Sequence, residues 1–294
     1  MPRRAPFATV FLTLLLAGCE SSPETETAAV VEGTATAPDG ISIAYDVRGA
    51  GATTLLFIHG WCCDRSFWRA QLDAFADEYR VVALDLAGHG QSAGGRDPWS
   101  IAAFGPDVLA VAEELDLDRV VLIGHSMGGP VSLHAAARLG DRVIGVVGVD
   151  TLHNAELEMP QAMLEQVSAA FEADFEGAMT GFVRSAFAES ADPQLVEWAT
   201  RKALAADPAM AVALLRDFLN VDLKALFSSA GVPVRCINAA ADPPARPATA
   251  AETNRRYADF DAVLIDDVGH FPHLERPEEF NVRLRETLAK IVGS

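Results

Sequence analysis

Ser126 is the residue of this chain whose type and surroundings point most directly to chemistry. It lies between Gly124 and Gly128, after the apolar run Val120–Ile123 and before a helical pattern that starts at Met127. A serine at a sharp turn from a strand into a helix is exposed, and small flanking residues let neighbouring backbone come close. The pattern therefore predicts a nucleophilic serine at a strand–helix turn.

The same short pattern occurs a second time, around Ser92 between Gly90 and Gly94. This serine follows a glycine-rich turn and precedes the sequence GRDP, which is a composition typical of loops. The strand before and the helix after, which the chemistry requires, are predicted for Ser126. We therefore interpret Ser92 as a structural loop residue and Ser126 as the nucleophile.

A serine hydroxyl needs a general base within hydrogen-bond reach, and that base needs an orienting group. Seven histidines are candidates for the base. His270 and His273 follow the last predicted strand, and ligands in such sheets bind at the carboxyl ends of the strands, where these loops gather. These two histidines are therefore the best placed to serve Ser126.

Alternating strand and helix patterns must position these residues. Nearly continuous apolar runs predict strands that are buried on both faces, and helical patterns lie between them, which indicates a mainly parallel sheet with helices on both sides. A hairpin is expected about Pro38-Asp39-Gly40. The expected strands are 33–37, 41–47, 54–58, 80–84, 120–123, 143–149, 233–238 and 262–266, and the expected helices are 64–76, 100–115, 127–139, 247–257 and 277–292.

From about Val31 to the C terminus, the order of motifs resembles the α/β-hydrolase family. The resemblance is carried by His59-Gly60-Trp61, by DLAGHGQS ending at Ser92, by GHSMG around Ser126, and by Gly269-His270. It implies an α/β fold with a mostly parallel, doubly wound sheet and an inserted all-helical cap. It also implies that the segment around Ser92 has a mainly structural role.

The resemblance also implies a catalytic triad that runs nucleophile, acid, base along the chain. Ser126 matches the nucleophile, His270 the base, and Asp242, a few residues beyond strand 233–238, the acid. Asp150 at the end of strand 143–149 is the alternative acid, and His273 is the alternative base. Asp266 and Asp267 are interpreted as surface acids because they lie too near His270 in sequence.

In the mechanism implied by this triad, Ser126 attacks an acyl carbon and water later hydrolyses the acyl-enzyme. The oxyanion would accept hydrogen bonds from the backbone N–H groups of Trp61 and Met127. Neither a metal nor an organic cofactor is implied. The expected partner is a small-molecule acyl substrate.

The predicted domains are a hydrolase core at 31–151 and 231–294 and a helical cap at 152–230, which lacks convincing strands. Most large apolar side chains of the cap are expected in its own core, and a minority would line an acyl pocket. One of Cys62 and Cys63 is a candidate to touch the substrate. The large cap side chains are Met159, Met163, Phe171, Phe175, Phe182, Phe187, Trp198 and Phe218.

The first 30 residues are expected to lie outside the fold. Arg3 and Arg4 precede an apolar run that is too short to span a bilayer and fits a signal peptide at 1–18. Leu16-Ala17-Gly18-Cys19 resembles the lipobox of bacterial lipoproteins. The resemblance implies lipidation of Cys19 and a location in the bacterial cell envelope; a plain secretory signal is the alternative. The segment that follows is rich in Ser, Thr and Glu, which predicts a flexible tether at 19–30.

The net charge of −18 argues against nucleic-acid binding and disfavours strongly anionic substrates. The leading hypothesis is a serine hydrolase for a small or medium uncharged carboxylic ester. Lactones, including acyl-homoserine lactones, and carbon–carbon bond hydrolysis are alternatives with the same triad. A non-catalytic envelope binding protein is a competing class, whereas epoxide hydrolases and dehalogenases place an aspartate where this chain has Ser126.

Overall fold

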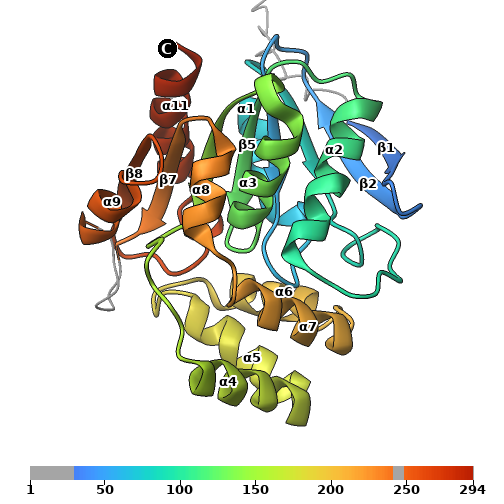
Figure 1. The fold of residues 1–294 in the computed structure, drawn as a ribbon, viewed down its shortest axis with the longest axis vertical. Helices are drawn as coiled ribbons and strands as arrows, with labels where there is room; N and C mark the ends of the chain where they lie inside the picture. Colours follow the sequence, from blue (N-terminus) through green and yellow to red (C-terminus); the bar gives the residue numbers. More distant parts are fainter. Residues whose placement is uncertain (1–29, 241–247, 294) are drawn as a thin grey trace, which may run out of the picture.

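The computed structural model describes residues 30–240 and 248–293, which form an eight-stranded sheet with the order β1-β2-β4-β3-β5-β6-β7-β8 (Figure 1). Strand β2 pairs antiparallel with both β1 and β4, and the remaining neighbours are parallel. The predicted fold class is confirmed. The strands are β1 (Val31–Thr36), β2 (Ser42–Arg48), β3 (Thr54–Ile58), β4 (Arg80–Leu84), β5 (Val120–His125), β6 (Val143–Val149), β7 (Val234–Ala239) and β8 (Phe260–Ile265).

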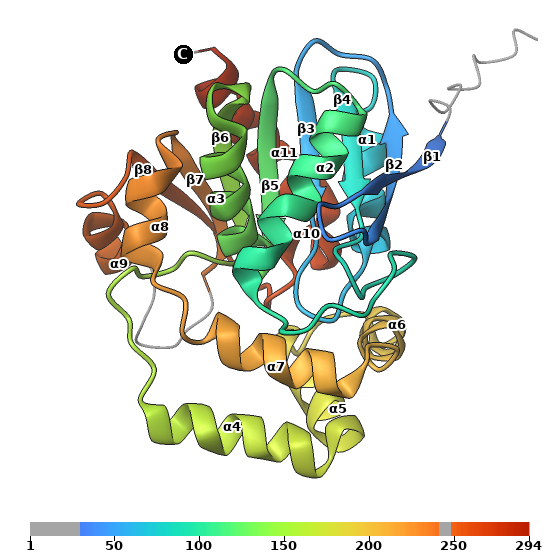
Figure 2. The same cartoon turned by 45° about the vertical axis from the view of Figure 1, so that its right-hand side comes forward.

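The central strands are apolar along their whole length because helices cover both of their faces. Every residue of β3 and β5 is buried. Helices α2 (Gly105–Glu114), α3 (Gly128–Leu139) and α8 (Leu223–Ala230) lie on one face, and α1 (Arg69–Phe75) and α11 (Pro277–Val292) lie on the other (Figure 2). Two separate apolar cores result, one on each side of the sheet.

The hairpin expected about Pro38-Asp39-Gly40 joins β1 and β2. The Ala37 N–H donates to the Ile41 carbonyl at 2.8 Å, and Gly40 has a φ of +84°. That left-handed conformation favours glycine. The short 3₁₀ helices at Arg65–Trp68 and Ile101–Phe104 precede α1 and α2, so each of those predicted helices begins with a tighter turn.

Four helices between β6 and β7 form a layer below the carboxyl ends of the parallel strands (Figures 1 and 2). Asp174, Asp192 and Asp207 cap α5, α6 and α7 by accepting a backbone N–H, which explains why the helical pattern breaks at these aspartates. Helix α8, also within 152–230, packs on α3 instead. The helices of this cap are α4 (Gln161–Ala173), α5 (Phe175–Ala186), α6 (Pro193–Ala203) and α7 (Pro208–Phe218).

A third apolar cluster joins the cap to the loops at the end of the sheet. It combines Phe171 and Phe187 of the cap with Cys63, Phe67 and Phe271 of the core. Phe187 and Phe271 stack with ring centroids 4.7 Å apart. Within residues 30–240 and 248–293, no helix is long and apolar enough to cross a membrane.

Candidate active site

Ser126 occupies the turn between β5 and α3 in a left-handed conformation with φ of 51°. For a non-glycine residue this conformation costs about 1 kcal/mol or more, so surrounding contacts must hold it. The Ser126 N–H donates to the Val149 carbonyl at 3.1 Å, and its carbonyl accepts from the Gly129 N–H at 2.9 Å and the Thr151 hydroxyl at 2.7 Å. The backbone on both sides of the serine is therefore fixed.

The glycines around Ser126 are required by close backbone approach. A Cβ atom on Gly124 would lie 2.1 Å from the Gly128 carbonyl oxygen. One on Gly128 would lie 2.5 Å from the Ile58 carbonyl oxygen. Both contacts are far below normal van der Waals separation, so the G-x-S-x-G pattern here follows from packing.

His270 and Asp150 form a hydrogen-bonded pair that lines the same cavity as Ser126. The His270 Nδ1 atom lies 2.6 Å from Asp150 Oδ2, and the buried carboxylate also accepts the Ala239 N–H at 2.9 Å through Oδ1. A carboxylate acceptor places the proton on Nδ1, which leaves the His270 Nε2 lone pair free to act as a base. The pair therefore has the connectivity of a base and its orienting acid.

Asp150 is held in its charged form despite complete burial. Burial by itself would raise the pKa of Asp150, but the hydrogen bond from His270, the nearby His270 and His153 rings and the Ala239 N–H outweigh it, and the pKa is lowered. His153 Nε2 lies 3.9 Å from Asp150 Oδ1. The ionised carboxylate is the form that a catalytic histidine requires.

Two predicted site residues lie outside the described part of the chain. Asp242 and Cys19 fall in the segments that the structure does not describe, so their roles stay predictions. Asp150, the alternative acid in the sequence, is the residue that contacts His270 Nδ1. Its position at the carboxyl end of β6, next to β5, was the signal that could have ranked it first.

The loop after β3 brings Gly60 against the nucleophile, and Trp61 lines the same cavity as Ser126. His59 accepts the Leu86 N–H through Nε2 at 3.0 Å, so its Nδ1 carries a proton and donates to the Gly60 carbonyl at 2.8 Å. A Cβ on Gly60 would lie only 3.2 Å from Ser126 Cβ. The Met127 N–H lies at the N terminus of α3, where backbone donors lack partners within the helix. Gly60, the residue before Trp61, thus packs against Ser126, and the oxyanion roles of the Trp61 and Met127 N–H groups stay predictions.

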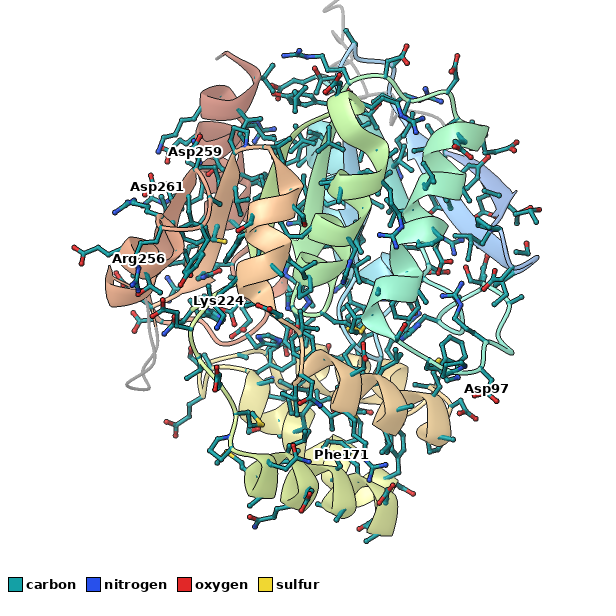
Figure 3. The ribbon with its side chains drawn as sticks, viewed as in Figure 1. Asp97, Phe171, Lys224, Arg256, Asp259 and Asp261 are labelled. Carbon is teal, nitrogen blue, oxygen red and sulfur yellow. The ribbon has the colours of Figure 1, made fainter. Side chains whose placement is uncertain are left out.

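Ser126 and His270 open onto an apolar cavity of about 430 Å³ between the sheet and the cap. Phe171, on helix α4 of the cap (Figure 3), lies in its wall. Its ring meets the Trp61 ring edge-on with centroids 5.2 Å apart. Cys63 also lines the cavity, whereas Cys62 is buried outside it. Further lining residues are Leu152, Met159, Val167, Phe182, Leu215, Phe218, Leu219 and Val221.

His273 and His125 lie behind the site rather than in the reacting position. His273 is fully buried, packs on Trp68 with ring centroids 4.4 Å apart and does not line the cavity. Burial, then the nearby His270 and Arg69, lowers its pKa to about 3, so its ring is neutral. His125 donates from Nε2 to the His270 carbonyl oxygen at 2.8 Å. Asp266 and Asp267 are exposed.

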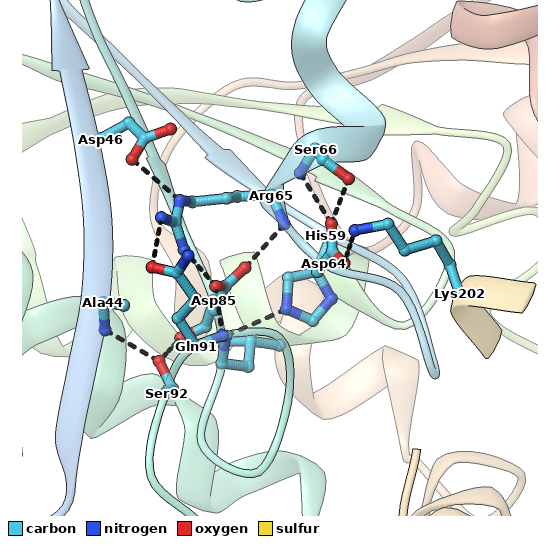
Figure 4. Close-up of polar contacts among 11 residues, drawn as sticks. Ala44, Asp46, His59, Asp64, Arg65, Ser66, Asp85, Gln91, Ser92 and Lys202 are labelled. Carbon is cyan, nitrogen blue, oxygen red and sulfur yellow. Dashed lines mark hydrogen bonds and ion pairs between the residues drawn. The ribbon is translucent and has the colours of Figure 1, made fainter. Parts of the chain in front are cut away.

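Ser92 lies in a separate polar network. Its hydroxyl donates to the Asp85 carbonyl at 2.6 Å and accepts the Ala44 N–H at 2.8 Å (Figure 4). The buried Asp85 carboxylate pairs with the Arg65 side chain and accepts the Arg65 and Gln91 N–H groups at 2.7 and 2.8 Å. The structure therefore agrees with a structural role for Ser92.

Sequence reasoning missed the residues that support the loop after β6. Asn238, at the end of β7, accepts the Thr151 N–H at 3.2 Å and donates to the Thr151 carbonyl at 3.3 Å. Thr151 in turn holds the Ser126 carbonyl. A buried asparagine at a strand end was the available signal, because a buried amide needs partners.

The fold and this site define an α/β hydrolase. The model of the family described as "Alpha/beta hydrolase family" matches residues 55–283. The chain therefore belongs to the alpha/beta hydrolase family and is an enzyme of that family.

Solved structures and curated proteins agree with this assignment. A thermophilic esterase from Thermogutta terrifontis has a TM-score of 0.75 and 29% identity, covering 90% of this chain and 99% of that one. Est816, described as an N-acyl homoserine lactone degrading enzyme, has a TM-score of 0.74 and 26% identity. The match covers 86% of this chain and 99% of that one.

A curated relative covers a shorter stretch. It is the dihydrolipoyllysine-residue acetyltransferase component of the acetoin cleaving system of Cupriavidus necator, 42% identical over 37% of this chain. The match spans 29% of that relative's length, and 42% of the length of the equivalent component of Pseudomonas putida. The chain thus corresponds to less than half of these two proteins.

Proposed function

We propose that this enzyme is a serine hydrolase that cleaves a small or medium uncharged carboxylic ester. The observation that carries the proposal is the 2.6 Å contact of His270 Nδ1 with Asp150 Oδ2 beside Ser126, at the wall of an apolar cavity of about 430 Å³. Cavities of this size hold a small organic molecule. The apolar lining favours an uncharged acyl group, since burying an unpaired charge there is costly.

In the proposed reaction, His270 Nε2 removes the proton from Ser126 Oγ as the oxygen attacks the ester carbonyl carbon. The negative charge on the carbonyl oxygen is bound by the Trp61 and Met127 N–H groups, each worth about 3 kcal/mol in the transition state. The C–O bond to the alcohol breaks, and His270 gives its proton to the leaving oxygen. Asp150 stabilises the imidazolium throughout.

The second half of the reaction releases the acid. His270 removes a proton from water, which attacks the acyl-enzyme carbonyl carbon. The tetrahedral intermediate uses the same two N–H donors, and its collapse returns the proton to Ser126 Oγ. Free carboxylic acid leaves and the enzyme is restored.

Lactone hydrolysis is the second candidate function, and a specific observation favours it. Thr151, His153 and Asn154 add polar groups to the largely apolar lining of the cavity. A ring ester with a polar substituent fits a cavity whose lining combines apolar and polar groups. The similarity to Est816 over 86% of this chain also supports lactone hydrolysis.

A substrate panel separates the two candidates. p-Nitrophenyl butyrate, octanoate and palmitate would be compared with N-acyl homoserine lactones of short and long acyl chain. The ester proposal predicts the highest kcat/KM for butyrate or octanoate and a steep loss for palmitate. A lactone kcat/KM well above every ester value would move the assignment to lactones.

We also propose that the chain is a lipoprotein anchored in the bacterial cell envelope through Cys19. The support is the order of Arg3 and Arg4, a short apolar run and Leu16-Ala17-Gly18-Cys19. Mass spectrometry of the mature N terminus should find acylated Cys19 as the first residue. An unmodified cysteine, or cleavage at another position, would contradict the anchor without affecting the catalytic proposal.

A further inference from the structure

One carboxylate outside the triad holds the loop that carries His270. Glu275 accepts the backbone N–H groups of Gly269 at 3.0 Å and Phe271 at 3.3 Å, which are the two residues that flank His270. Glu275 is the last residue of the short helix α10 (Pro272–Glu275). Bonds from N–H donors to an ionised acceptor are roughly twice as strong as neutral ones, so this loop is firmly held.

The same carboxylate reaches the cap. Glu275 Oε2 accepts the Ala188 N–H at 3.0 Å, just after the end of α5. The cap also contacts the base directly, because the His270 N–H donates to the Ala186 carbonyl at 2.5 Å. A Cβ on Gly269 would lie 2.3 Å from that carbonyl oxygen, so the approach of the cap explains the glycine before the histidine.

A helix-capping role alone does not account for these contacts. A carboxylate that only capped α10 would bond to the N–H of Phe271, the residue before the helix. The donors Gly269 and Ala188 lie outside α10, one in the loop of the base and one in the cap. Glu275 therefore links three segments that meet at His270.

We propose that Glu275 is a positioning residue for catalysis. Through Gly269 and Phe271 it keeps the His270 ring between Asp150 and Ser126, and through Ala188 it ties that position to the cap. The proposal rests on the serine-hydrolase function proposed above. A displacement of about 1 Å at a reacting group can cost about 100-fold in rate, so a loosened loop should lower kcat strongly.

The test compares Glu275→Ala and Glu275→Gln with the matched control Glu278→Gln, an exposed glutamate in the first turn of α11. With p-nitrophenyl butyrate, Glu275→Ala should lower kcat by about 100-fold while KM stays within about threefold. The kcat of Glu275→Gln should lie between those of Glu275→Ala and wild type, because the amide keeps one acceptor oxygen but loses the charge. Glu278→Gln should have the kcat and KM of wild type.

A structural role alone would give a different result. If Glu275→Ala lowers the melting temperature but keeps wild-type kcat, or if the whole loss is in KM, the proposal is wrong. If Glu275→Ala does not fold, Glu275→Gln carries the test because it keeps the size of the side chain. An unchanged kcat in folded Glu275→Gln would then overturn the proposal.

A second readout does not depend on the substrate. The His270 Nδ1–H proton, assigned by its loss in Asp150→Asn, should give a low-field NMR signal that shifts or broadens in Glu275→Gln. An unchanged signal would contradict a positioning role. If wild type neither hydrolyses esters nor reacts with a fluorophosphonate, the proposed function fails, and the NMR result still decides the role of Glu275.

Discussion

His270 Nδ1 and Asp150 Oδ2 lie 2.6 Å apart although 120 residues separate them in the chain. Asp150 follows β6, and His270 lies in the loop beyond β8. Parallel strands bring their carboxyl ends to one edge of the sheet, and Ser126 after β5 lies at that edge as well. The sheet thus assembles three residues from distant parts of the chain.

Asp150→Asn should lower kcat by about 10⁴-fold, because an amide partner favours the wrong tautomer of His270. The matched variant is Asp242→Asn, which removes the acid expected from the sequence. Since Asp150 occupies the Nδ1 side of His270, Asp242→Asn should retain most of the wild-type kcat. Steady-state kinetics with p-nitrophenyl butyrate measure both. A larger loss of kcat in Asp242→Asn than in Asp150→Asn would show that Asp242 is the acid that orients His270.

Phe182→Ala should raise KM for apolar esters several-fold with little change in kcat. Phe182 lines the cavity near Trp61, with ring centroids 5.5 Å apart, and is 39% exposed, so its loss removes contact area for the substrate without opening the core. Interactions that are equal in the ground and transition states affect KM alone. Val282→Ala, an exposed change on α11, is the control. A selective loss of kcat in Phe182→Ala would contradict this role.

Stability should fall as the pH drops below about 6.5, because buried histidines stay neutral in the fold. Burial lowers the pKa of His273 to about 3 and that of His59 to about 4, from an ordinary value of 6.5. The unfolded chain therefore binds more protons below pH 6.5, and the free energy of unfolding decreases with falling pH toward the folded-state values.

His273→Phe should make that pH dependence less steep by about 1.4 kcal/mol per pH unit, since one proton-binding group is removed. Phenylalanine suits the site because Trp68, Phe271 and Phe280 surround the ring. Urea unfolding between about pH 7 and pH 5 measures the slope. A slope equal to that of wild type would show that His273 is not kept neutral by burial.

Asp85→Ala should cost about 3–5 kcal/mol of unfolding free energy, because it removes the more deeply buried of the two carboxylates that pair with Arg65, the other being Asp46, and leaves the Arg65 and Gln91 N–H groups without their acceptor. Asp73→Ala is the matched control. This variant removes the carboxylate that pairs with Arg48. Because Asp73 is 66% exposed, its ion pair should contribute at most about 1 kcal/mol to the free energy of unfolding. Equal losses in the two variants, measured by urea unfolding, would contradict the structural role of the Asp85 network.

The sequence predicted the sheet well because both-sided burial leaves an unmistakable apolar run in each central strand. The run around Val121 and Ile123 lies in β5, and its turn at Ser126 follows from glycines that no other residue could replace. Helix α8 was harder to place. Its pattern resembles that of the cap helices, and only its packing against α3 shows which layer it covers.

The candidate site was predictable where local order defines it, as for Ser126 and His270. The contact of Asp150 with His270 depends on the relative position of two loops, which no local pattern encodes. The role of Glu275 was hidden for the same reason, since all three of its donors lie outside its own helix, one of them in the cap. Contacts between loops and the cap are set by tertiary packing.

The most direct test of the account is the reaction of the purified protein with a fluorophosphonate probe, followed by peptide mass spectrometry. Wild type should be labelled on Ser126, and Ser126→Ala should be unlabelled. Ser92→Ala, which removes the other serine in a G-x-S-x-G pattern, should still be labelled. Absence of label on wild type, or equal labelling of Ser126→Ala, would contradict the claim that Ser126 is the activated nucleophile of a serine hydrolase.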